Sequence, residues 1–166
     1  MNQKLKTGFC YLVEIIDING QVRDSETVDN LVPIEGLNHM LGVTLKGAAQ
    51  INSWFIGLYE GNYTPQSSDT ATTFPGSSTE TTAYSEAARP VLTLGAATAG
   101  AADNAAARAE FTFNATKTIY GGFIASTSAK GSTSGILISA VRFSSPKVLA
   151  SGEILRVTAG FTLVSV

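Results

Sequence analysis

The C-terminal third of this chain decides its fold. It reads AEFTFNATKTIYGGFIAST over residues 109–127, GILISAVRFSSPK over 135–147 and GEILRVTAGFTLVSV over 152–166. These stretches are rich in Ile, Val, Phe and Thr and are broken by Gly and Ser, a pattern that predicts strands joined by turns. We expect strands at 110–115, 118–125, 136–143 and 153–164. Gly160 is expected to mark a bulge or bend in the last of them.

Upstream of this region, most segments also favour strands. Residues 9–30 predict a hairpin whose turn ends in Asn19-Gly20, a pair that tolerates positive φ. Residues 53–60, SWFIGLYE, are apolar on both faces and predict a central strand with Trp54 buried. Residues 83–95 predict a further strand, and Pro90 restricts it to an edge or to its beginning. Residues 95–109 are small and predict a loop.

One segment favours a helix. Pro33 precedes an early Glu35, apolar residues follow at helical spacing, and Gly42 ends the pattern, so a short helix is expected at about 34–42. About eight strands with no βαβ spacing predict an all-β fold, namely an antiparallel two-sheet sandwich, with the jelly roll as one candidate topology. We expect residues 1–30 to form an N-terminal hairpin or arm and 31–166 the sandwich domain.

Composition narrows the classes of function. Only 14% of the 166 residues are charged, against about 25% in typical soluble domains, and the net charge is −2. Interface cores are depleted in charge, so we expect part of the surface to be covered in an assembly, such as a homo-dimer or trimer. No basic run indicates nucleic acid, and no apolar run reaches the length of a membrane span. An ordinary monomeric β domain with a bland surface is the alternative.

Residues that could carry chemistry are sparse. His39 is the only histidine and is expected to be a packing or surface residue, because a metal site needs several ligands. Cys10 lies in an apolar strand, where a buried, inert thiol is expected. No nucleophile elbow, P-loop or dinucleotide fingerprint occurs. The sequence therefore predicts no enzyme, no catalytic or metal-binding residues and no cofactor.

Residues for interaction with other chains are predicted in two places. The second hairpin strand carries Arg23, Asp24 and Glu26, which are expected to contact another chain. For the acidic cluster of Asp24, Glu26 and Asp29, a solvated strand face is a commoner explanation than a Ca²⁺ site. The segment 62–82 is longer than most loops in compact domains and is expected to fold against a neighbour, with Tyr63 and Phe74 as contacts.

Five segments of the chain carry a resemblance to known proteins. They are NLVPIEGLNHMLGVTLKG (30–47), SWFIGLYEGNYTP (53–65), TAYSEAARP (82–90), ADNAAARAEFTFNATKTIYGGFIAST (102–127) and GILISAVRFSSPKVLASGEILRVTAGFTL (135–163). They resemble small virion proteins encoded by tailed bacteriophages, some of which resemble capsid decoration, or cement, proteins. The resemblance implies a β-rich domain that is made in the bacterial cytoplasm, binds the major capsid protein on the outside of the shell and bridges its subunits.

The function expected from these observations is therefore that of a capsid decoration protein at the virion surface. A tail-tube, tail-tip or fibre module with a β-sandwich is one alternative. A carbohydrate-binding or receptor-binding module is another, although strand aromatics are more often core. The aromatic residues that could line a sugar-binding face are Trp54, Phe55, Tyr59, Tyr63 and Phe74.

Overall fold

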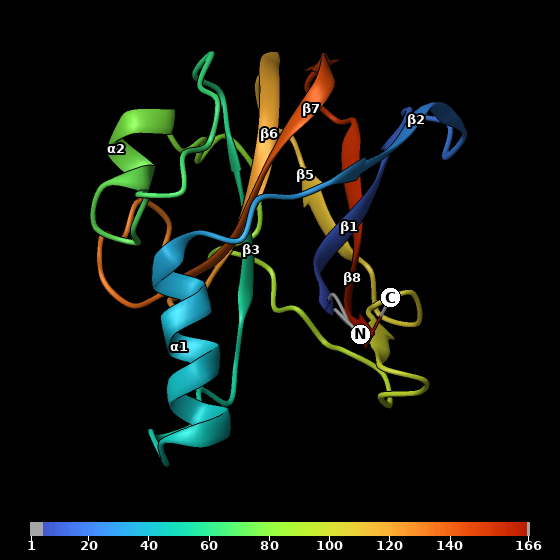
Figure 1. The fold of residues 1–166 in the computed structure, drawn as a ribbon. Coiled ribbons are helices and arrows are strands. Elements are labelled where there is room, and N and C mark those ends of the chain that lie inside the picture. Colours follow the sequence, from blue (N-terminus) through green and yellow to red (C-terminus); the bar gives the residue numbers. More distant parts are fainter. Residues whose placement is uncertain (1–4, 166) are drawn as a thin grey trace.

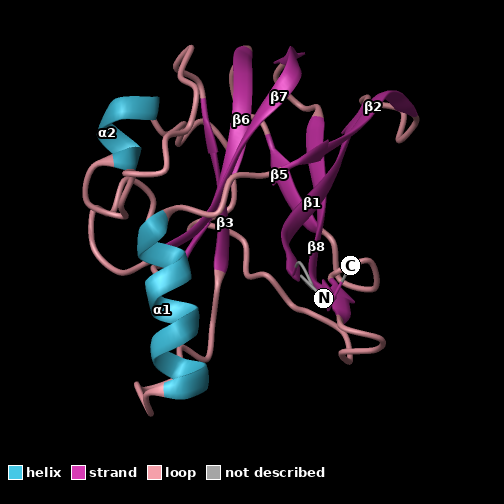
Figure 2. Ribbon diagram, viewed as in Figure 1, coloured by secondary structure: helices cyan, strands magenta, loops and turns pink. Residues whose placement is uncertain are grey.

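The computed structural model describes residues 5–165 and contains two antiparallel sheets, one long helix and one short helix (Figures 1 and 2). In chain order, the elements are β1 (Leu5–Ile16), β2 (Val22–Asp29), α1 (Ile34–Leu45), β3 (Phe55–Tyr59), α2 (Phe74–Ser78), β4 (Ala101–Asp103), β5 (Ala109–Thr112), β6 (Lys117–Ala125), β7 (Leu137–Leu149) and β8 (Ile154–Ser165). The expectation of an all-β fold with two antiparallel sheets is confirmed.

The first sheet is built around the two ends of the described chain. Strand β1 pairs with β2 on one side and, from Leu5↔Ser165 to Ile16↔Ile154, with β8 on the other. The outer side of β8 pairs with β5 and β4. The predicted hairpin exists, but its first strand is internal to the sheet, so the expected division into an arm and a separate sandwich is corrected. Residues 1–4 of that arm lie outside the described residues.

The second sheet has the order β3-β6-β7, so β6 is its central strand and β3 lies at its edge, not in its centre as expected. The other side of β3 is nevertheless covered. The amide of Ile56 donates to the carbonyl of Pro90, and the amide of Thr81 donates to the carbonyl of Leu58. The segment predicted as a strand at 83–95 contributes only isolated bridges to this edge and to Phe113.

The core lies between the sheets, and strand alternation explains its composition. Alternate residues of β1 and β8 point inward, and side chains of β3, β6 and β7 meet them from the other sheet. The fully buried members include Tyr11, Val13, Ile15, Ile56, Leu58, Ile119, Ile124, Leu155 and Val157. The same alternation turns Cys10 outward, so its thiol is exposed and the expectation of a buried thiol is wrong.

Helix α1 packs against β7 through its first turn, where a side chain at Gly36 would meet the backbone of Ile138. The helix continues past the predicted end at Gly42. The amides of Lys46 and Ala48 both donate to the carbonyl of Gly42, and Gly47 adopts the positive φ of 68° that ends the helix. The extra turn carries Leu45 beyond the part of the helix that contacts β7.

The predicted bulge at Gly160 is also absent. The β1–β8 register passes through Cys10↔Gly160 without a shift. Gly160 instead pairs with Asp103 of β4, and a Cβ at this position would lie 3.3 Å from the Cβ of Asp103. The glycine therefore permits the close approach of a third strand.

Candidate functional site: apolar surfaces at the two ends of the molecule

Three charged side chains of β2, those of Arg23, Asp24 and Glu26, are engaged within the chain. The Nζ of Lys147 on β7 lies 2.9 Å from Oδ2 of Asp24 and 2.9 Å from Oε2 of Glu26, and its side chain is only 2% exposed. Glu26 also accepts hydrogen bonds from the amide and hydroxyl of Ser144. Burial lowers the pKa of Lys147, but its hydrogen bonds to Glu26 and Asp24 outweigh this and raise that pKa above its ordinary value.

Arg23 fastens the β1–β2 hairpin to the turn between β7 and β8. Its Nε and Nη2 donate to the carboxylate of Glu153 at 2.6 and 2.7 Å, and Nη2 also donates to the carbonyl of Val148. The hydrogen bond from Arg23 holds the pKa of Glu153 below its usual range. Arg23, Asp24 and Glu26 therefore form a clasp between the sheets, and their contact with another chain stays a prediction.

Tyr63 and Phe74 belong to a second apolar cluster on the outer face of the β3-β6-β7 sheet. Phe74 is fully buried, and its ring lies edge-on to those of Tyr59, Tyr63 and Phe123. The hydroxyl of Tyr63 donates to the buried carboxylate of Asp69 at 2.8 Å. The segment 62–82 thus folds onto its own sheet through α2, and the expectation that Phe74 contacts a neighbouring chain is wrong.

Within residues 5–165, no group of His, Cys, Asp and Glu side chains is arranged to hold a metal ion. The ring of His39 packs edge-on against Trp54, with 5.5 Å between ring centroids. Trp54 is half-buried against the main core, immediately before β3. In the same described part of the chain, no helix is both long and apolar enough to cross a membrane.

Helix α1 carries an exposed apolar surface. Ile34, Leu37, Leu41 and Leu45 recur at spacings of three and four residues, which places them on one side of the helix. They are 52%, 37%, 55% and 75% exposed. The opposite side, with Gly36 and Met40, faces the body of the protein. An aliphatic stripe left open to water is a mark of an interaction surface.

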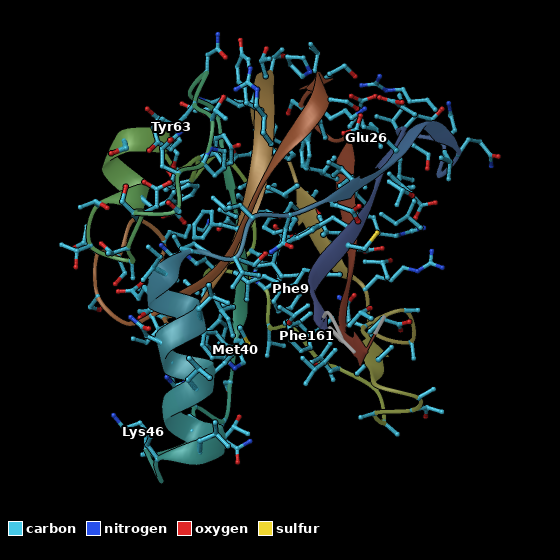
Figure 3. The ribbon with its side chains drawn as sticks, viewed as in Figure 1. Phe9, Glu26, Met40, Lys46, Tyr63 and Phe161 are labelled. Carbon is cyan, nitrogen blue, oxygen red and sulfur yellow. The ribbon has the colours of Figure 1, made fainter. Side chains whose placement is uncertain are left out.

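A groove runs between this helix and the end of the first sheet. It has a volume of about 490 Å³ and is lined mainly by Leu37, Met40, Leu41, Leu45, Phe161 and Leu163, which together we call the α1 face. Figure 3 shows Met40 and Phe161 on either side of the groove, with Phe9 above them and Lys46 at the far end of the helix. A smaller hollow, about 210 Å³, continues past Met40 and Phe161 to Trp54 and Leu94.

A second apolar surface lies at the opposite end of the molecule, where the β1–β2 and β7–β8 turns meet (Figure 1). Ile18, Val22 and Val148, which we call the tip patch, are 76%, 51% and 54% exposed. The methyl group Cγ2 of Ile18 lies 3.6 Å from the position that a Cβ of Gly152 would occupy. The Arg23 bond to Val148 holds the two turns together.

Sequence reasoning missed both surfaces. The sequence predicts the helix but not which of its apolar residues stay exposed. Leu37 and Leu41 are exposed, whereas Met40 and Val43, elsewhere on its circumference, are partly buried. The apolar residues extend around a wide arc of the helix, whereas a helix needs only one apolar stripe to pack on a sheet. This excess could have indicated that some of them stay exposed. The tip patch has no such signal, because single apolar residues in turns are common on protein surfaces.

Comparison with protein-family models, with curated proteins and with solved structures finds no match to this chain.

Proposed function

We propose that this chain is a structural protein of a tailed-phage virion, specifically a capsid decoration protein that binds the major capsid protein on the outer shell and bridges its subunits. The observation that carries this proposal is that apolar surface is exposed at both ends of the domain. The α1 face lies at one end and the tip patch at the other. Bridging requires one surface that contacts the shell and a second surface that contacts another chain, held at a fixed separation.

Hydrogen bonds and ion pairs that hold the two sheets together support a role in bridging subunits. The backbone groups of Leu31 and Ala140 exchange hydrogen bonds between the β2 end and β7. The clasp of Lys147 and Arg23 adds ion pairs along the same side. On the other side, the ion pair of Arg89 and Glu80 is 1% and 2% exposed and ties the 127–132 loop to the body. Rigid parts lose little conformational freedom when they bind.

The composition of the exposed surface favours protein over sugar as the ligand. Among the residues that the structure describes, the large apolar side chains that are well exposed are all Ile, Val or Leu. Sugar-binding faces depend on exposed aromatic rings, whereas aliphatic patches fit protein partners. Jelly-roll topology stays a prediction, since the hairpins β1–β2 and β6–β7 each lie within one sheet, and the proposed function does not depend on it.

We assign the shell contact to the tip patch, because it is compact and lies where two turns are fastened together. The test is co-sedimentation of the purified protein with undecorated shells, followed by cryo-electron microscopy. We expect Ile18→Glu to abolish co-sedimentation without lowering the melting temperature, since Ile18 is mostly exposed. Thr133→Glu, at an exposed position of the 127–135 loop, is the matched control and should bind like the wild type.

Failure of the wild-type protein to bind shells at any ratio would overturn the proposed function. Binding by Ile18→Glu with unchanged saturation would overturn the assignment to the tip patch, and the density in the map would then identify the contact.

A further inference from the structure

We propose that the α1 face is a two-fold interface between two copies of this chain. This inference goes beyond the shell contact, because it concerns the protein in free solution and a surface at the opposite end of the molecule. It depends on the shape, the charge and the apolar character of the face, taken in turn below.

The shape of the α1 face is self-complementary. Leu41 and Leu45 form a ridge on the exposed side of the helix, and the groove of about 490 Å³ lies directly beside them, between the helix and Phe161 and Leu163. In a two-fold pair each patch meets its own copy, so a face must offer both a projection and a hollow. The ridge of one copy can therefore enter the groove of the other, and the reverse contact follows by symmetry.

The charge of the face permits an identical partner. The described residues that line the groove carry no charge. Glu35 is the only acidic or basic residue of α1 besides His39, and its carboxylate accepts hydrogen bonds from the amides of Ala71 and Leu137 at 2.8 and 2.6 Å. Like charges directly opposed across a two-fold axis disfavour self-association, and here the helix brings none to the interface.

The apolar character also points to a copy of the same chain. Interfaces between identical subunits are more apolar than those between proteins that also exist apart. The exposed leucines of α1 and Leu163, 49% exposed, line the groove, and Leu94, 40% exposed, lines the adjoining hollow, so the exposed apolar residues are grouped along the helix. Such a surface is larger than the scattered single residues normal for a monomer.

The experiment is sedimentation velocity of the purified full chain over a range of concentrations, with no shells present. We expect the wild-type protein to be dimeric at micromolar concentration. The double variant Leu41→Glu/Leu45→Glu should weaken the dimer by more than about a hundredfold, because it places charges in an apolar interface. Its melting temperature extrapolated to low concentration should match that of the wild type, since both side chains are at least half exposed.

Ile18→Glu with Val22→Glu is the matched control, because it introduces the same two charges at exposed aliphatic positions away from α1, and it should remain dimeric. Hydrogen exchange gives a second readout: amides of residues 37–45 should gain protection as the wild-type concentration rises. A wild-type protein that stays monomeric at tens of micromolar would overturn the inference, as would a dimer that persists in the double variant. Neither result bears on shell binding, so the two proposals fail separately.

Discussion

The hydroxyl of Tyr11 on β1 lies 2.6 Å from the hydroxyl of Ser139 on β7, and this hydrogen bond crosses the buried core between the two sheets. Asn30 completes the connection. Its side-chain amide donates to Ser139 at 2.7 Å, and its oxygen accepts the amide of Phe9 at 2.7 Å. Three polar side chains thus fix how the sheets lie against each other.

Tyr11→Phe removes one end of this connection but leaves Ser139 bonded to Asn30. We expect a loss of about 1 kcal/mol in the free energy of unfolding, measured by urea denaturation. Asn30→Ala should cost more, about 2 kcal/mol, because it leaves the Phe9 amide without its acceptor. Equal losses in the two variants would contradict the ranking of the two sites.

Phe74→Ala tests whether the 62–82 segment is part of the fold. Because Phe74 is fully buried among three aromatic rings, we expect a loss of about 3–5 kcal/mol in stability. Tyr63→Phe is the milder companion change. It removes only the hydrogen bond to Asp69 and should cost about 1 kcal/mol. A Phe74→Ala protein of wild-type stability would show that the segment does not fold onto its sheet.

Stability should depend on pH through the clasp on β2. Hydrogen bonds from Lys147 and Arg23 lower the pKa of Asp24 and Glu153, and Lys147 and Ser144 lower that of Glu26 in spite of its burial. The unfolded chain therefore binds more protons in acid. The contribution of these groups is fully present above about pH 5 and is lost as the pH falls through their depressed values, below about 4. Urea midpoints across this range measure it.

Lys147→Met should lower stability at neutral pH by about 3 kcal/mol, because it leaves two carboxylates facing each other without their cation. It should also flatten the acid limb of the pH profile, since those carboxylates lose the partner that depresses their pKa. Glu110→Gln is the control, because the Glu110–Arg156 pair is exposed and worth little. An acid limb that is as steep in Lys147→Met as in the wild type would contradict the role of the clasp.

Deletion of residues 1–30 should unfold the protein rather than free a sandwich domain. The deletion removes β1 and β2, and with them Tyr11, Val13 and Ile15 from the core and the hydrogen-bonded partner of β8. Circular dichroism and the dispersion of amide resonances would detect the loss. A cooperative thermal transition in the truncated chain would contradict this prediction. It would instead support the expectation that residues 1–30 form an arm separate from the sandwich domain.

The sequence predicts strand identity better than strand partnership. The density of β-forming residues over 8–16 and 153–164 correctly indicates strands, because this composition is a local signal. That β1 lies between β2 and β8 depends on contacts across almost the whole chain, which no local pattern encodes. For the same reason, the charged residues Arg23 and Asp24 are interpreted from the sequence as part of a solvated strand face. Their partners Glu153 and Lys147 lie far away in sequence.

The candidate site was missed for a related physical reason. Burial of an apolar helix is the default expectation, and only the placement of α1 against β7 decides which of its sides remains open. Gly36 determines the orientation of the helix, because its lack of a side chain lets the helix approach Ile138. The side of the helix that carries Leu37 is therefore exposed to solvent. The sequence alone does not predict that this glycine is a packing contact, because the strand that it contacts lies far away in the chain.

The pairing of β1 with β8 has a consequence for how the chain is made. All residues from β1 to β8 must leave the ribosome before β1 meets its partner, so the central ladder of the first sheet forms only after β8 has been made. Contacts so distant in sequence also slow folding. Until then the apolar β1 strand has only its β2 hairpin to pair with, and a lone hairpin is marginally stable. Folding is thus tied to the synthesis of β8, and a nascent chain interrupted before β8 cannot assemble this core.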